Sequence, residues 1–408
     1  MSYYLENFTV RPTLISTEVP NNLSVVVVIP CCNETALTDA LQSLYDCKNT
    51  EGSVEVITVI NASEKAEEAI IAQNQQTVLA AKKWAETHQK ENLNFYFIEE
   101  NSLPKKHAGV GLARKIGMDE AARRFESINK ANGVILCYDA DANCETNYLV
   151  EVEKHFQKYA KTPACSIHFE HPISGIEFTE EIYDGITQYE LHLRIYKNGL
   201  KYANLPYAFH TIGSSMAVRS DAYQKQNGMN KRKAGEDFYF LQKLIPLGNF
   251  TELKTTKVIP SPRVSDRVPF GTGKAMQNWM DDGKPQMQSY AVQSYQELKQ
   301  FNAVLSQVYK SDNVELPTSI NTFLESINWE KDLENIRKNS TSEQRFVQLF
   351  YNWFNAFKVL KFMHFARDNY YLDTTVFDAG NNLLALLSKE QQKNNTALLV
   401  VFRGVDKL

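Results

Sequence analysis

A short, nearly continuous run of β-branched residues at 23–29, Leu-Ser-Val-Val-Val-Val-Ile, restricts what this chain can fold into. A strand with apolar side chains on both faces has to be covered on both faces, as in parallel sheets flanked by helices. Similar runs occur at 54–60, 95–98, 134–138 and 164–169, and segments with helical periodicity separate most of them. Strands that alternate with helices at this spacing predict an α/β fold with a mainly parallel sheet and helices on both faces.

The pattern changes along the chain, which predicts a division into regions. Residues 1–22 show no regular periodicity and are interpreted as a lead-in. The alternation of strands and helices occupies 23–275, whereas 284–408 is predicted to be helical apart from a strand-like tail at 398–402. Aromatic residues recur at helical spacing within 343–372, which favours a core helix over a membrane or acceptor surface.

The composition excludes several classes of partner. The formal net charge of the 408 residues is −4, so neither a nucleic-acid protein nor a polybasic membrane binder is expected. The first residues lack the basic and apolar regions of a signal peptide, and no apolar run approaches the ~20 residues that span a bilayer. The six cysteines show no Cys-x-x-Cys spacing, which indicates a reducing compartment and no zinc site. We expect a cytoplasmic protein, with peripheral contact at the inner face of the membrane left open.

Two aspartates one residue apart, Asp139 and Asp141, come after the apolar run at 134–138. Side chains two positions apart on a strand point the same way, so both carboxylates can face the edge where parallel sheets bind ligands. Hard oxygen ligands of this kind suit Mg²⁺ or Mn²⁺ carrying a phosphate. The competing interpretation is a turn with solvated acidic ends, because Asp-x-Asp alone is a common pattern.

Two later segments are open to more than one interpretation. Glu236 and Asp237 begin a predicted helix, where the macrodipole favours anions. They are either part of a functional site or simply the solvated start of a helix. The stretch 256–273 is rich in Pro, Gly, Ser and Arg and is predicted to be a loop. With Arg263, Arg267 and its glycines it is either a flap that closes on a diphosphate or acceptor, or a surface connection between domains.

Four segments, taken in order, resemble the inverting family 2 glycosyltransferases with the GT-A fold over roughly residues 23–270. They match the first strand with its nucleotide loop, the glycine/alanine-arginine helix opening, the DxD metal motif, and the acceptor strand with the catalytic Glu-Asp. The segments are Val27-Val-Ile-Pro30-Cys-Cys32-Asn33-Glu34, Gly109-Val-Gly-Leu-Ala-Arg114-Lys-Ile-Gly117, Asp139-Ala-Asp141, and Gly213-Ser214-Ser215-Met-Ala-Val218 with Gly228 and Gly235-Glu236-Asp237. The resemblance makes 23–275 a GT-A domain, with a helical C-terminal region after it.

The resemblance implies a metal-dependent, inverting transfer of one sugar, of the hexosyltransferase type, from a nucleotide-diphosphate donor. The acceptor hydroxyl would belong to a glycan, a lipid-linked precursor or a small molecule. Asp141 would hold Mn²⁺ or Mg²⁺, with Asp139 near the metal or the ribose, and the ion would stabilise the departing diphosphate. Asp237 would be the general base, with Glu236 beside it. The residues expected to contact the nucleotide-sugar are Pro30, Cys32, Asn33, Glu34, Asn61, Arg114, Asp139, Ser214, Ser215, Arg263 and Arg267.

The chain departs from the family pattern mainly around the nucleoside. Cys32 stands where an aromatic residue is common, and Asn61 stands where the second strand commonly ends in an aspartate. These departures leave the nucleobase open and motivate one alternative, a degenerate nucleotide-binding module without transfer activity. A second alternative, a sugar nucleotidyltransferase, would require a glycine-rich basic loop after the first strand, but the residues after Pro30 are Cys-Cys-Asn-Glu. Whether His210 or His171 joins the site is also left open.

Overall fold

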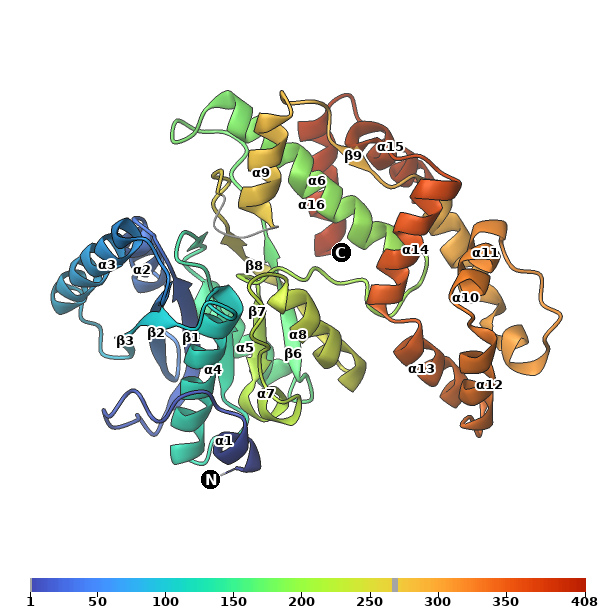
Figure 1. Cartoon of the computed structure of the whole chain (residues 1–408). Helices are drawn as coiled ribbons and strands as arrows, with labels where there is room; N and C mark the ends of the chain where they lie inside the picture. The colour runs from blue at the N-terminus through green and yellow to red at the C-terminus, as the bar shows by residue number, and fades with distance from the viewer. Residues whose placement is uncertain (1, 266–270) are drawn as a thin grey trace. The chain divides into compact units, whose positions relative to one another are not determined.

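The computed structural model describes residues 2–265 and 271–408. The chain divides into two compact units (Figure 1). The first contains Met1–Ile182 and Thr211–Asn278, and the second contains Tyr183–His210 and Trp279–Leu408. The second unit therefore takes in a helix from the middle of the chain in addition to the C-terminal helices that the sequence indicated.

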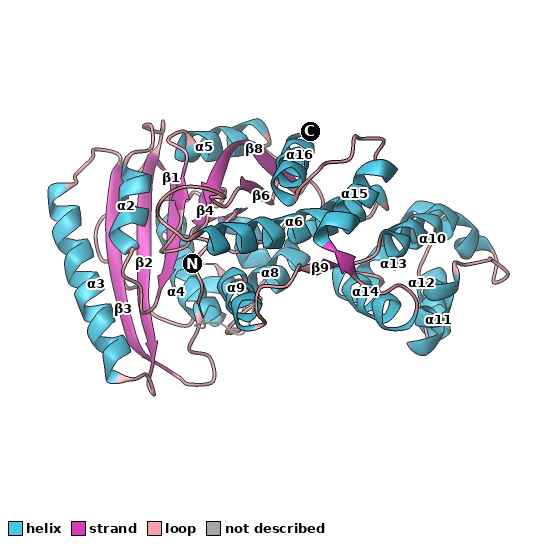
Figure 2. Cartoon of the chain, turned by 90° about the horizontal axis from the view of Figure 1, so that it is seen from above, coloured by secondary structure: helices cyan, strands magenta, loops and turns pink. Residues whose placement is uncertain are grey.

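The first unit is built on one sheet, which in the described residues has eight strands in the order β3-β2-β1-β4-β7-β6-β8-β5. β3, β2, β1 and β4 pair in parallel, β7 runs antiparallel to both β4 and β6, β6 and β8 are parallel, and β5 is antiparallel to β8. The strands are β1 Leu23–Cys31, β2 Ser53–Ser63, β3 Leu93–Leu103, β4 Val134–Cys137, β5 Asn143–Cys144, β6 Ala164–Phe169, β7 Met216–Arg219 and β8 Thr251–Ile259. Figure 2 shows β1, β2 and β3 side by side.

Helices cover both faces of the sheet, as right-handed crossovers require when the strand order reverses after β3. α2 and α3 lie on one side of β1 to β3 and α4 lies on the other (Figure 1). The helices of this unit are α1 Tyr3–Asn7, α2 Leu37–Tyr45, α3 Glu68–Thr87, α4 Val110–Ser127, α5 Tyr148–Lys158, α7 Ser220–Lys225, α8 Glu236–Leu244 and the 3-10 turn η1 Ile245–Leu247; α9 Thr272–Asp281 lies at its end. This architecture confirms the predicted α/β class and is consistent with a GT-A fold.

The lead-in at 1–22 is attached to α4 through buried polar contacts. The hydroxyl of Tyr4 donates to Asp119 (2.6 Å), and Lys115 donates to that hydroxyl (2.7 Å). Two backbone N–H groups of the lead-in, those of residues 14 and 15, donate to the buried carboxylate of Glu120. Lys115 is thus part of the contact between the lead-in and α4.

Two stretches differ from the sequence prediction. The predicted loop 256–273 begins inside β8 and ends inside α9. β8 was missed because its threonines and lysines make a polar strand whose burial only partly alternates. The strand-like tail at 398–402 belongs to helix α16, Asn395–Lys407. Asn394 caps this helix by accepting the N–H of Ala397 (2.8 Å), so local capping decided the structure of a short apolar run.

The second unit is helical, with a short two-stranded sheet. Its elements are α6 Glu180–Tyr202, which begins just before the unit, β9 Gln288–Ser289, α10 Val292–Lys310, α11 Thr318–Ser326, α12 Glu330–Lys338, α13 Glu343–Trp353, α14 Ala356–Asn369, β10 Thr374–Thr375, α15 Val376–Leu386 and α16. The aromatic stretch 343–372 forms α13 and α14, whose phenylalanines 346, 350 and 362 are buried as predicted for a core segment. Within the parts of the chain that the structure describes, no helix is long and apolar enough to cross a bilayer.

A buried polar network joins α6 to α16 inside this unit. Asp406 accepts from Lys197 (2.9 Å) and is also ion-paired with Arg194. His210 contacts the same carboxylate through Nε2 at 2.9 Å. The structure therefore gives His210 a structural partner in the helical unit.

Candidate functional site

The loop after β1 is fixed by two polar side chains of α3. Asn33 adopts a left-handed backbone conformation (φ 49°), and its N–H donates to the side-chain oxygen of Asn74 (2.9 Å). The amide of Asn74 also donates to the carbonyl of Asn61 at the end of β2 (3.1 Å), and Thr77 donates to the carbonyl of Glu34 (2.5 Å). Because Asn74 and Thr77 are buried, these bonds set the relative positions of two strand ends.

Glycines bring α4 close to two other segments of the site. A Cβ on Gly111 would lie 2.2 Å from the carbonyl oxygen of Arg232, so only glycine lets α4 approach the segment before α8. A Cβ on Gly117 would lie 2.5 Å from a methyl of Val28, on the side where α4 packs against β1. The glycine motif predicted to open a helix therefore allows close backbone packing.

Arg114 of α4 connects the two acidic segments of the sequence. Its guanidinium is 2% exposed, and its Nη2 donates to Asp139 at 2.6 Å. Its Nη1 donates to the carboxylate of Glu236, which is also 2% exposed. Gly213, just before β7, leaves the space for this guanidinium, because a Cβ there would lie 2.6 Å from Nη1. One buried cation thus joins residues from the end of β4 and the start of α8.

Glu236 and Asp237 at the start of α8 have raised pKa values. Burial raises the pKa of Glu236 to about 7, with the negative charge of Asp237 adding to this and the guanidinium opposing it. Burial also raises the pKa of Asp237. The carboxylate of Glu236 is ion-paired with Arg114. Asp237 is half-buried, and its side chain accepts the N–H of Phe238 (2.7 Å). Of the two neighbours, Asp237 is thus the more exposed.

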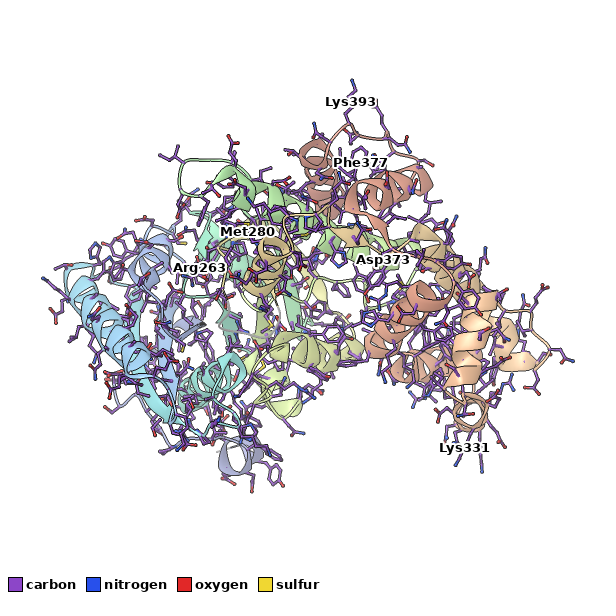
Figure 3. The ribbon with its side chains drawn as sticks, turned by 45° about the horizontal axis from the view of Figure 1, so that its top comes forward. Arg263, Met280, Lys331, Asp373, Phe377 and Lys393 are labelled. Carbon is purple, nitrogen blue, oxygen red and sulfur yellow. The ribbon has the colours of Figure 1, made fainter. Side chains whose placement is uncertain are left out.

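Asp141 is paired with Arg263, which lies on the loop after β8 (Figure 3). The Nη2 of Arg263 is 2.7 Å from Oδ2 of Asp141. The same guanidinium donates through both terminal nitrogens to Glu34, with 2.9 Å between Nη1 and Oε1. Glu34 is buried in the loop after β1. Arg263 therefore connects the first predicted motif to the third.

The carboxylates of Asp139 and Asp141 have the oxygen chemistry that Mg²⁺ and Mn²⁺ prefer. Each is paired with an arginine, and the described residues contain no group of three or more His, Cys, Asp or Glu placed to hold a metal ion. Magnesium is commonly held by one or two carboxylates together with substrate phosphates. The donor set therefore fits a metal that the phosphates of a ligand help to bind, and it does not form a complete protein cage.

Most of the predicted residues lie next to the ends of strands β1, β4 and β7 or at the start of α8. Pro30 pairs in register with Val59, beyond the part of β1 that β4 reaches, and Cys32 comes two residues later, half-buried. Ser214 and Ser215 are buried before β7, and the hydroxyl of Ser215 has no hydrogen-bond partner among the described residues. Arg267 lies outside the described residues.

Sequence reasoning missed Asn74 and Thr77, which lie in the middle of α3. Polar residues inside a helix are usually solvated, so their burial has no local sequence signal. His171, whose place in the site the sequence left open, is buried beside Phe169, with 5.6 Å between the ring centroids.

No protein-family model matches this chain, and no curated protein sequence matches it. Similar solved structures include residues 1–349 of TarS from S. aureus in complex with UDP-GlcNAc. It is 13% identical, covers 94% of this chain and 90% of its own, and has a TM-score of 0.39. The mannosyltransferase PcManGT from Pyrobaculum calidifontis, in complex with GDP-Man and Mn²⁺, is 13% identical over 99% of this chain and 93% of its own, with a TM-score of 0.39.

Proposed function

We propose that this chain is an inverting glycosyltransferase that moves one sugar from a nucleotide-diphosphate donor to an acceptor hydroxyl. The observation that carries the proposal is the buried Arg114, which binds Asp139 with one nitrogen and Glu236 with another. A metal-and-phosphate motif and a base motif have to lie side by side for a single displacement. This guanidinium links the two motifs.

On the donor side, the departing diphosphate gains negative charge as the bond to the anomeric carbon breaks, and that charge has to be stabilised. Asp139, Asp141 and Arg263 lie together after β4 and β8, and their side chains are 38%, 22% and 27% exposed. A divalent ion shared by Asp141 and the donor phosphates would supply Lewis-acid stabilisation there. Arg263 supplies a guanidinium, whose planar fork matches phosphate oxygens.

On the acceptor side, the base has to take a proton from a weakly acidic hydroxyl. Asp237 takes that proton while the acceptor oxygen bonds to the anomeric carbon, and the electron pair of the broken bond leaves with the diphosphate. A raised pKa makes Asp237 a stronger base, and its partial exposure lets the acceptor approach. Glu236 acts through Arg114 and holds the start of α8 in position.

A second candidate, a nucleotide-binding module without transfer activity, is favoured by the arginine pairing of both aspartates of the DxD motif. In that candidate the ion pairs persist and no metal enters. Both candidates bind nucleotide. They differ in that only the first transfers a sugar.

The test is a donor screen with the full chain. Calorimetry measures the binding of UDP, GDP and their sugar derivatives with and without Mn²⁺, and a coupled assay measures release of nucleoside diphosphate. The proposal predicts binding that Mn²⁺ strengthens and slow release from at least one sugar nucleotide. Binding without release for every donor and acceptor tried would favour the module, and no binding at all would refute both candidates.

A further inference from the structure

Arg263 occupies the point where two acidic motifs of the first unit converge. It forms a two-pronged ion pair with Glu34 after β1 and an ion pair with Asp141 after β4, with 2.7 Å between Nη2 and Oδ2. Its Nε is buried and has no hydrogen-bond partner among the described residues. The guanidinium therefore bridges the loops after β1 and β4, in a position where a metal ion could also bind.

The two carboxylates differ in how firmly they are held. Glu34 is 1% exposed, its side chain accepts the N–H of Ala36 (3.0 Å), and Thr77 binds its carbonyl. Asp141 is more exposed, with a side chain 22% accessible. Glu34 is thus a fixed anchor for Arg263, and Asp141 is the partner that can exchange.

A divalent ion on Asp141 would conflict with this arrangement. Ligand oxygens lie about 2.1 Å from Mg²⁺, so an ion on the Oδ2 that Arg263 contacts would be within a few ångströms of the guanidinium. Two cations at that separation repel each other strongly in a partly buried site. The ion and Arg263 therefore cannot both use Asp141 as the structure shows it.

We infer that Arg263 competes with the divalent ion for Asp141, and that the ion, on binding, releases Arg263 to the donor's diphosphate. Glu34 keeps the guanidinium near the site during this exchange. Arg263 is then a positioning residue for the metal and a ligand of the diphosphate. The inference rests on the proposed function for the identity of the anion, but the competition for Asp141 exists without any nucleotide.

The test measures Mn²⁺ binding to the nucleotide-free full chain by electron paramagnetic resonance. We expect Arg263→Gln to bind Mn²⁺ at least about tenfold more tightly than the unmodified chain, and Arg263→Lys to be intermediate because a point charge makes a weaker pair. The matched control is Lys257→Gln, which removes a charge from β8 that pairs with Glu170 (2.7 Å) and should change Mn²⁺ affinity less than twofold. Asp141→Asn in the Arg263→Gln background should abolish the gain.

A second readout separates this inference from the proposed function. Calorimetry with UDP and GDP at saturating Mn²⁺, where the inference places Arg263 on the diphosphate, should show binding at least about fivefold weaker in Arg263→Gln than in Lys257→Gln. Unchanged or weaker Mn²⁺ binding by both Arg263 variants, each with a native thermal transition, overturns the inference, as does a gain that survives Asp141→Asn. The proposed function fails separately, if no sugar nucleotide releases its diphosphate.

Discussion

Gly213→Ala tests whether the position of the Arg114 guanidinium controls catalysis. An alanine Cβ would lie 2.6 Å from Nη1 and 2.9 Å from Nη2, whereas ordinary contacts begin at 3.4 Å. The guanidinium, or the backbone before β7, therefore has to move by about 0.8 Å. The end of a free arginine would yield easily, but ion pairs with Asp139 and Glu236 hold this one.

The expected effect has two measurable parts. Overpacking a buried site costs about 1–3 kcal/mol, so the free energy of unfolding in urea should fall by that amount. A misplacement near 1 Å lowers catalytic rates by about 10²-fold, so kcat for sugar transfer should fall by roughly that factor. The control is Gly404→Ala in α16, where a Cβ meets no atom within 4 Å and the helix should gain stability slightly. The reasoning would be refuted if kcat of Gly213→Ala stayed within twofold of the parent and its free energy of unfolding within about 0.5 kcal/mol. A change of that size in stability is the usual scatter of neutral substitutions.

Three further results are expected. Asn74→Ala should lower the free energy of unfolding by about 1–3 kcal/mol and weaken donor binding in calorimetry, because it removes buried hydrogen bonds that hold the loop after β1; unchanged donor affinity would contradict this role. Asp406→Asn should cost about 3–5 kcal/mol in urea unfolding, because the buried arginine and lysine of α6 lose their shared carboxylate; a cost below 1 kcal/mol would show that the network is not buried as described. The pH profile of kcat should show an acid limb well above pH 4, because the pKa values of Glu236 and Asp237 are raised and activity falls as pH falls through them; a limb at the ordinary aspartate pKa would exclude this pair.

The same raised pKa values predict the sign of one stability effect. A buried carboxyl with a pKa above its unfolded value binds its proton more tightly in the folded state. The contribution of Glu236 and Asp237 to stability is therefore largest at low pH and decreases as pH rises through their raised pKa values. Urea unfolding of Glu236→Gln across pH 5–8 should show a flatter profile than the parent.

The class of fold could be predicted from sequence because strands buried on both faces have a strong local signal. The runs that became β1, β2, β4 and β6 consist mostly of apolar residues, and their spacing leaves room for crossover helices. β8 gave no such signal, since its threonines and lysines make a partly exposed strand that only pairing with β6 explains. The apolar tail at 398–402 shows the opposite failure, because a short apolar run suits a strand and a helix equally.

The sequence indicated the motifs of the candidate site but not the contacts between them. Asp139 was singled out by its place after a strand, and Asp237 by the resemblance to the family motif. The bond between Arg114 and Glu236 joins residues 122 positions apart, so no spacing rule predicts it. The pairing of Arg263 with Glu34 spans 229 positions and depends on how β8 ends.

The most direct test of the central claim compares Asp237→Asn with the parent chain at saturating concentrations of a donor identified by the screen. We expect kcat to fall by about 10²–10⁴-fold, the range for loss of a general base, with donor Kd changed less than threefold. Asp221→Asn is the control. Among the described residues, the carboxylate of Asp221 forms an ion pair with a surface lysine four residues away. Full transfer activity in Asp237→Asn, or an equal loss of donor binding and of kcat, would contradict the assignment of Asp237 as the base.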